Sequence, residues 1–357
     1  MPVTIMTPSA ETAALKANRR RWLVLLAKLF VAGGLLVWLL ASGRLDLGQL
    51  RQVRHVGYLV LALAILLVNM VLPVWRWMWL LKVQGLIVPW RTAAGMTWLG
   101  YFAAIFLPGA AGGDLPKAVV ACRHQPDARA RAVSTVILDR LLGLHSMLFV
   151  GGIAGVCVLS GSPTHGQAAV AWLALAALAV SSAGMALLLA RPTSDLAMKI
   201  LPKRFRQPLA DSLARYRRSW RALAGIWLFS GLCSLTGIAS YLPVTIALGL
   251  RPSAGQVVAL PLVIVANSLP ISPGGLGVGE AVGSELFDQF GLPGGGMIVL
   301  LVRLGVILLS APGALAILGR YRPRQSCEPI PDRQPPQASI TNASPAGRTD
   351  AMEGINP

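Results

Sequence analysis

The sequence has few charged residues, and acidic residues are the scarcest of them. Charged residues make up 13% of the chain, against roughly 25% in soluble domains. Only 14 acidic residues accompany 32 Lys and Arg, whereas 55% of all residues are hydrophobic. Because several uncharged apolar runs reach the roughly 20 residues that span a bilayer, the composition predicts an integral membrane protein rather than a soluble enzyme.

Cysteine and histidine are also scarce. The chain has four of each, and Cys122, Cys157, Cys233 and Cys327 form no CxxC pair. A disulfide framework or a zinc site is therefore not expected. The sequence also lacks GxSxG, HExxH and P-loop motifs, which are common signatures of hydrolases, metalloproteases and nucleotide-binding proteins. We expect no metal, no cofactor and no soluble catalytic domain.

The net charge of +18 permits nucleic-acid binding as one interpretation. The basic residues lie between apolar runs, however, which is the pattern of membrane topology. We therefore expect membrane lipids with anionic head groups as partners, and no nucleic acid.

The apolar runs are continuous rather than alternating, which predicts helices. The first run follows the basic segment 1–21 and is longer than a cleavable signal sequence, so we expect it to remain as a helix. Spanning helices are predicted at 22–41, 58–81, 141–160, 168–190, 222–248 and 296–318.

Two further apolar segments, 92–122 and 255–290, are broken by LPGAAGGD at 107–114 and by LPISPGGLG at 269–277. Proline and paired glycines end a helix. Each segment is either a spanning helix with a loop or a re-entrant hairpin that returns to the same side. The residues that make the breaks are Pro108, Gly112, Gly113, Pro270, Pro273, Gly274 and Gly275.

The distribution of basic residues favours two hairpins. If both segments are re-entrant, 25 of the 32 Lys and Arg face one side, in the stretches 1–21, 82–91, 117–140, 191–221 and 319–357. If each segment crosses once, two of the most basic stretches face outside, against the positive-inside rule. The sequence thus predicts a multi-pass inner-membrane protein with both termini cytoplasmic, and six spans with two hairpins rather than the eight spans of a simple hydropathy scan.

Two cytoplasmic segments lie outside the predicted transmembrane domain, which covers 22–318. Segment 191–221 places apolar residues at spacings of three and four among Arg and Lys. This pattern predicts a basic amphipathic helix on the inner membrane surface, with a solvated loop as the alternative. The tail 319–357 is rich in proline and poor in apolar residues, which predicts disorder.

The two broken segments match each other as AxxLPxxxGG, beginning at Ala104 and Ala266. Further along, Val136–Leu141 matches Val299–Leu304, so that Arg140 and Arg303 are equivalent. The chain thus divides into repeats at about 22–160 and 168–318, which have opposite orientations if both segments are hairpins. We predict an all-α helical bundle of two inverted repeats, an architecture of transporters in which the substrate binds at the broken helices.

Charged and polar residues inside the apolar segments are the candidate site, because a charge within a bilayer costs roughly 2.5–3.5 kcal/mol on insertion scales. Each has a simpler alternative. Asp114 fits a helix N-cap, Glu280 an ion pair with Arg303 or Arg140, and the two arginines an interfacial position. Asn267 fits a cap or a bridge between helices. The candidate lipid head-group residues are Asp114, Arg140, Asn267, Glu280 and Arg303.

Two further features are interpreted as structural or left open. Arg76 lies between Trp75 and Trp77, a composition typical of the aromatic belt at a membrane interface. One face of helix 222–248 carries small and polar residues, which favour either helix packing or the lining of a polar path. These residues are Ser230, Ser234, Gly237, Tyr241 and Thr245.

These motifs resemble a known family. LPGAAGGDLPKA and VILDRLLGL in the first half, with NSLPISPGGLGVGEAVGSELF and LVRLGV in the second, are similar to the lysylphosphatidylglycerol synthase transmembrane region, or flippase-like family, over about residues 20–318. The resemblance implies a bundle that moves or presents lipids. Bifunctional relatives flip aminoacylated phosphatidylglycerol, and others belong to glycolipid, polyprenyl-linked sugar or hopanoid pathways. The family's acidic and arginine positions correspond to Asp114, Arg140, Glu280 and Arg303.

The sequence departs from the family pattern in two places. The chain ends at Pro357 without an aminoacyl-transferring domain, so synthesis of lysyl-lipid is not expected. The first break reads AIFLP, without an asparagine before Leu107, which leaves the polar contacts of that tip open.

Three functions are consistent with the sequence. The first is a lipid flippase that moves an anionic or glycosylated phospholipid between leaflets, with no catalytic activity. The second is an accessory membrane subunit that works with a lipid-modifying enzyme. The third is an intramembrane glycosyltransferase, which the predicted outer loop 42–57 supports poorly because it offers only Asp46 as an acid.

Overall fold

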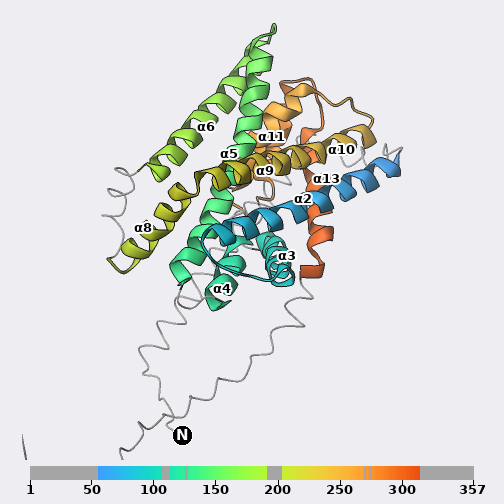
Figure 1. Ribbon diagram of the computed structural model, residues 1–357. Coiled ribbons are helices and arrows are strands. Elements are labelled where there is room, and N and C mark those ends of the chain that lie inside the picture. Colours follow the sequence, from blue (N-terminus) through green and yellow to red (C-terminus); the bar gives the residue numbers. More distant parts are fainter. Residues whose placement is uncertain are drawn as a thin grey trace, which may run out of the picture. The chain divides into compact units, whose positions relative to one another are not determined.

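The computed structural model describes residues 55–106, 113–124, 128–190, 203–268, 271–272 and 275–313. In these ranges the regular elements are all helices (Figure 1). The predicted helix 22–41, the N-terminal segment 1–21 and the tail 319–357 lie outside the described residues. So do five of the break residues, namely Pro108, Gly112, Pro270, Pro273 and Gly274.

Four helical segments within the described ranges are long and apolar enough to cross a membrane, and each matches a predicted span. They are α2 (Val56–Val83), α5 (Arg129–Leu159), α6 (His165–Leu189) and the continuous pair α9 and α10 (Trp220–Ala239 and Tyr241–Ala247). Helix α5 begins well before the predicted start at 141. The predicted start left Asp139 outside the span, whereas Asp139 is buried and paired inside the bundle.

A proline explains the break between α9 and α10. Pro243 has no N–H to donate to the carbonyl of Ala239, and its ring crowds that carbonyl. Helix α9 accordingly ends at Ala239, and Ser240 joins it to α10. Tyr241 and Val244 of α10 are buried in the bundle core.

Each broken segment folds as two short helices in mutual contact. The first consists of α3 (Trp90–Phe106) and α4 (Asp114–His124), and the second of α11 (Ala254–Ser268) and α12 (Val278–Asp288). Helices α3 and α11 end just before the Leu-Pro pairs, because a residue that precedes proline is disfavoured in the helical region. The two parts of the first broken segment are packed so closely that a Cβ on Gly113 would lie 2.5 Å from the carbonyl oxygen of Gly100.

The predicted span 296–318 corresponds to α13 (Gly295–Ser310), after which the described residues end at 313. Helix α13 packs against α12 through small residues. A Cβ on Gly295 would lie 2.5 Å from the carbonyl oxygen of Gly283, and one on Gly296 would lie 2.9 Å from the carbonyl oxygen of Glu280. Small residues at helix contacts allow the close approach on which packing in membranes depends.

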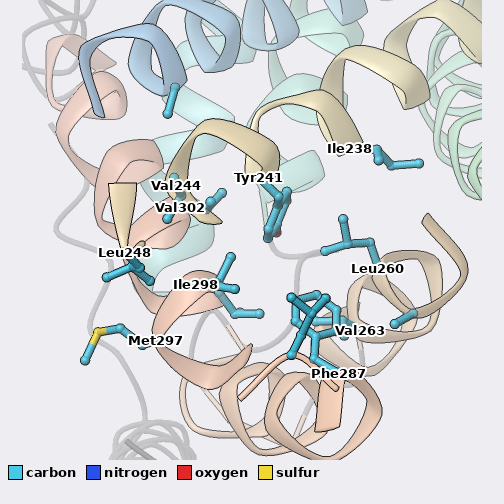
Figure 2. Close-up of a cluster of buried hydrophobic side chains, with 14 of the residues drawn as sticks. Ile238, Tyr241, Val244, Leu248, Leu260, Val263, Phe287, Met297, Ile298 and Val302 are labelled. Atoms are coloured by element: carbon cyan, nitrogen blue, oxygen red, sulfur yellow. The ribbon is translucent and has the colours of Figure 1, made fainter. Parts of the chain in front are cut away.

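The apolar cluster beside this contact fixes the second broken segment in place (Figure 2). Its buried residues come from α2, α5 and the segment from α9 to α13, and include Leu66, Met147, Tyr241, Phe287 and Ile298. Because Phe287 and Ile298 are fully buried, α12 and α13 have little freedom to shift, which holds Glu280 and Arg303 at a fixed separation.

The predicted amphipathic segment contains helix α8 (Lys203–Arg218). Its apolar side chains Leu213 and Tyr216 are buried, and Tyr216 packs in one cluster with Leu80, Leu138 and Leu142 of the bundle. This part of the apolar face therefore contacts protein, whereas Asp211 and Arg215 are exposed. Leu201, Phe205 and Leu209, which continue the predicted apolar face, have no described side chains.

Candidate functional site

Arg303, Glu280 and Asn267 form one polar group at the second broken segment. Arg303 Nε lies 2.7 Å from Glu280 Oε1, and Arg303 Nη2 donates to Asn267 Oδ1 at 2.9 Å and to the carbonyl of Gly275 at 3.1 Å. Glu280 is fully buried. Of the two partners that the sequence left open for Glu280, the structure thus selects Arg303.

Glycines allow the backbone to wrap around this group. Gly275 and Gly277 have φ of 74° and 81°, which side-chain-bearing residues rarely adopt. The N–H of Gly277 donates to Glu280 Oε2 at 2.8 Å, so the same carboxylate caps α12. A Cβ on Gly279 would collide with the side-chain oxygen of Asn267. The described residues Gly275 to Gly279, which follow the break, are thus held against α11 and α13.

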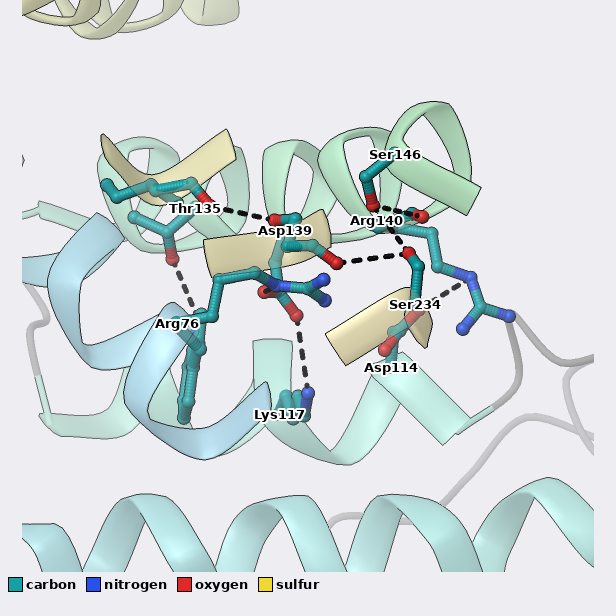
Figure 3. Close-up of polar contacts among 12 residues, drawn as sticks. Arg76, Asp114, Lys117, Thr135, Asp139, Arg140, Ser146 and Ser234 are labelled. Carbon is teal, nitrogen blue, oxygen red and sulfur yellow. Dashed lines mark hydrogen bonds and ion pairs between the residues drawn. The ribbon is translucent and has the colours of Figure 1, made fainter. Parts of the chain in front are cut away.

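A second buried charge cluster lies in the first half (Figure 3). Asp139 of α5 lies between two cations, with Arg76 Nε 2.7 Å from Oδ1 and Lys117 Nζ 3.6 Å from Oδ2. All three side chains are less than a tenth exposed. Lys117 also lies over the ring of Trp77, whose indole N–H donates to Thr135.

This cluster corrects the interpretation of Arg76 as part of an interfacial belt. Trp75 and Trp79 are indeed exposed, but Arg76 and Trp77 point into the bundle. Adjacent residues on a helix diverge by about 100°, so one stretch can supply both a lipid-facing and a buried side. The partner of Arg76, Asp139, lies 63 residues away in sequence. Local spacing of residues could not indicate this pair.

Asp114 and Arg140 form a looser pair at the start of α4. Arg140 Nε lies 3.7 Å from Asp114 Oδ2, and the two side chains are 42% and 22% exposed. Asp114 occupies the first turn of α4, where the helix dipole favours a carboxylate. Its position is consistent with the predicted role at the helix start, and its side chain also contacts a candidate site residue.

A cavity of about 310 Å³ lies between the two halves of the chain. Arg76, Arg140 and Gly143 line it from the first half, and Asn267 and Ser268 from the second. Its volume falls within the roughly 300–1,000 Å³ that is usual for small-molecule sites. Two of the predicted head-group residues, Arg140 and Asn267, thus line the same cavity.

The polar face of α9 and α10 serves both of the roles that the sequence left open. Ser234, Gly237 and Tyr241 line the cavity. Ser230 instead donates to its own helix, and Thr245 accepts from Gln256 at 2.6 Å. The middle of this face therefore borders the cavity, and its ends are used for packing.

Arg303 lies beside this cavity rather than in its lining. It borders a smaller pocket of about 100 Å³ together with Tyr101, Ala104 and Ile105 of α3 and with Leu276. The described ends of the two broken segments thus meet around Arg303. The remaining predicted residues, Asp114 and Glu280, contact the site through their arginine partners.

Sequence analysis missed Arg76, Lys117 and Asp139 as site residues. The one available signal was that each carries a charge within or next to an apolar run. That signal does not separate a buried cluster from interfacial positions, because both place charges near helix ends. Among the described residues, no group of His, Cys, Asp and Glu could hold a metal ion.

The comparisons with known proteins agree with the geometry. A family model described as the lysylphosphatidylglycerol synthase TM region matches residues 25–313. No curated protein and no solved structure matches the chain significantly. The matched region includes both broken segments, the cavity and all five predicted head-group residues. The chain therefore belongs to the lysylphosphatidylglycerol synthase transmembrane-region family.

Proposed function

We propose that the protein moves an anionic or glycosylated phospholipid between the leaflets of the inner membrane, without catalysing a reaction. The cavity between the two halves carries this proposal. It combines arginine and serine side chains with apolar ones such as Leu66 and Val306, as a passage for an amphipathic molecule requires. Two broken helical segments that meet beside such a cavity are typical of transporters.

Movement follows from rocking of the two halves about this cavity. In this proposal the halves are inverted repeats, the broken segments are re-entrant, and both termini are cytoplasmic. The head group crosses within the polar cavity, whereas the acyl chains stay in the lipid. The exposed apolar surface of α6 and α9, which includes Trp172 and Leu228, faces those chains.

Reconstituted vesicles provide the test. We expect the purified protein to move fluorescently labelled phosphatidylglycerol between leaflets faster than protein-free vesicles do, in a dithionite-quenching assay run with and without a pH gradient. Replacement of Gly143 by leucine fills the cavity beside Arg76, since a Cβ there would lie 2.9 Å from the Arg76 guanidinium. We expect the Gly143→Leu variant to lose most of this movement.

The matched control is Gly225→Leu in α9, where a Cβ would meet nothing within 4 Å. This variant should move lipid as the parent does. Lipid movement no faster than in protein-free vesicles, under either condition, would contradict the flippase proposal and favour an accessory subunit of a lipid-modifying pathway.

A further inference from the structure

Two arginine side chains, Arg76 of α2 and Arg140 of α5, line the cavity. Arg76 contacts Asp139 through Nε, and its Nη1 and Nη2 lie against Gly143, which itself lines the cavity. Arg140 lies near Asp114 through Nε only. Its Nη2 is buried and has no hydrogen-bond partner among the described residues. Helices α2 and α5 thus each contribute to the cavity lining a guanidinium group that uses only part of its N–H donors.

The local charges do not balance. Around the first half of the cavity, Arg76, Lys117 and Arg140 carry three positive charges. Their described carboxylate partners are Asp114 and Asp139, which leaves one positive charge uncompensated. Because Arg76 and Lys117 are less than a tenth exposed, an excess of charge beside them is costly, and a single bound anion would neutralise it.

The equivalent arginine of the second half is already satisfied. Arg303 uses Nε for Glu280 and Nη2 for Asn267 and Gly275, and its side chain is only 13% exposed, against 42% for Arg140. Glu280 matches its charge one for one. Despite the sequence repeat, Arg303 therefore leaves no uncompensated charge for an anion, in contrast to the arginines of the first half.

We propose that Arg76 and Arg140 together bind one phosphodiester group of a lipid head group in this cavity. Guanidinium groups bind phosphate oxygens through paired N–H donors. A phosphodiester carries one negative charge, which equals the local excess. A phosphomonoester carries about −1.5 to −2 at pH 7, which would leave the site negatively charged. Ser234 and Asn267 in the same lining can contact head-group hydroxyls.

This inference rests on the proposed function for its lipid, and binding measurements test it separately from movement. We would titrate the detergent-purified protein by calorimetry with dioctanoyl phosphatidylglycerol, dioctanoyl phosphatidic acid, dioctanoylglycerol and sodium phosphate. Dioctanoyl phosphatidylglycerol should bind tightest. Dioctanoylglycerol, which has no phosphate, should not bind.

Arg140→Gln removes one guanidinium group, and its partly exposed position should leave the fold intact. We expect this variant to bind dioctanoyl phosphatidylglycerol about tenfold to a hundredfold more weakly, as for the loss of hydrogen bonds to a charged group. Arg129→Gln is the matched control, because Arg129 is exposed at the start of the same helix. Arg76→Lys keeps the positive charge beside Asp139 but removes the paired N–H donors of the guanidinium group. This variant should also bind dioctanoyl phosphatidylglycerol more weakly.

Three results would overturn the site. They are equal affinity of Arg140→Gln and Arg129→Gln, tighter binding of phosphatidic acid than of phosphatidylglycerol, and displacement of the lipid by free phosphate at similar concentrations. The last would identify a soluble phosphate as the ligand. Selective binding without leaflet movement would instead refute the proposed function and leave the phosphodiester site standing.

Discussion

At the scale of single residues, Arg140 and Arg303 show how one repeat position can acquire two roles. Both follow a Val-x-Leu-x motif and begin the same pattern of apolar residues. Arg303 is enclosed by Glu280, Asn267 and a backbone carbonyl, whereas Arg140 faces a cavity with one loose partner at 3.7 Å. The enclosed arginine holds a turn in place, and the open one remains available to a ligand.

The Glu280–Arg303 pair should contribute strongly to stability. Removal of one partner from a buried ion pair costs roughly 3–5 kcal/mol because it strands the other charge. We therefore expect Glu280→Gln and Arg303→Gln each to lower the thermal unfolding midpoint in detergent clearly. The double variant should be less destabilised than the sum of the two single variants. Additive losses would contradict direct coupling between the two side chains.

At the scale of elements, the second broken segment depends on the contact between α11 and α12. Asn267 at the end of α11 lies against Gly275 and Gly279, and accepts a hydrogen bond from Arg303 of α13. Three helices thus converge on one amide side chain. Among the described residues, Asn267, Glu280 and Arg303 therefore form a polar junction between α11, α12 and α13.

Gly279→Ala should disrupt this junction. The new Cβ would collide with the side chain of Asn267, and overpacking of this kind costs roughly 1–3 kcal/mol. Gly231→Ala in α9 is the control, because a Cβ there meets nothing within 4 Å and alanine favours a helix by up to about 1 kcal/mol over glycine. We expect opposite shifts of the thermal unfolding midpoint. Equal shifts for both variants would argue against the close approach at Gly279.

At the scale of the whole molecule, the bundle encloses a few charged side chains within a mainly apolar interior and also exposes large apolar residues on its outer surface. The interior holds Asp139, Glu280 and their cations, whereas α6 and α9 expose large apolar residues such as Val180 and Leu232. In water such a surface would drive aggregation. In a bilayer it is the surface that contacts acyl chains.

Labelling of single cysteines tests the predicted topology. In a variant without the native cysteines, Ser162→Cys lies in the exposed loop between α5 and α6, and Asp211→Cys lies on the exposed side of α8. With re-entrant segments, a membrane-impermeant maleimide should label Cys at position 162 in intact cells and at position 211 only after permeabilisation. The reverse pattern would mean that the first broken segment crosses the membrane, because both positions lie between the two segments.

The positions of the helices follow closely from the sequence. Apolar runs of membrane-spanning length identified α2, α5, α6 and the α9–α10 pair, and Leu-Pro pairs marked the ends of α3 and α11. These features are local, because hydrogen bonds within a helix and the missing N–H of proline depend on near neighbours. The motifs around the two breaks were also sufficient for the family, which the match over residues 25–313 confirms.

The pairing of charges was decided by the tertiary structure alone. Nothing in the sequence around Arg76 indicated that its side chain would be buried and would pair with Asp139. Nor did the sequence indicate that Lys117 would contact the same carboxylate. Sequence repetition likewise made Arg140 and Arg303 equivalent, although only Arg140 lines the large cavity. The reason is physical: a helix sequence fixes which residues share a face, but the partner of a buried charge depends on which helices pack together and at what distance.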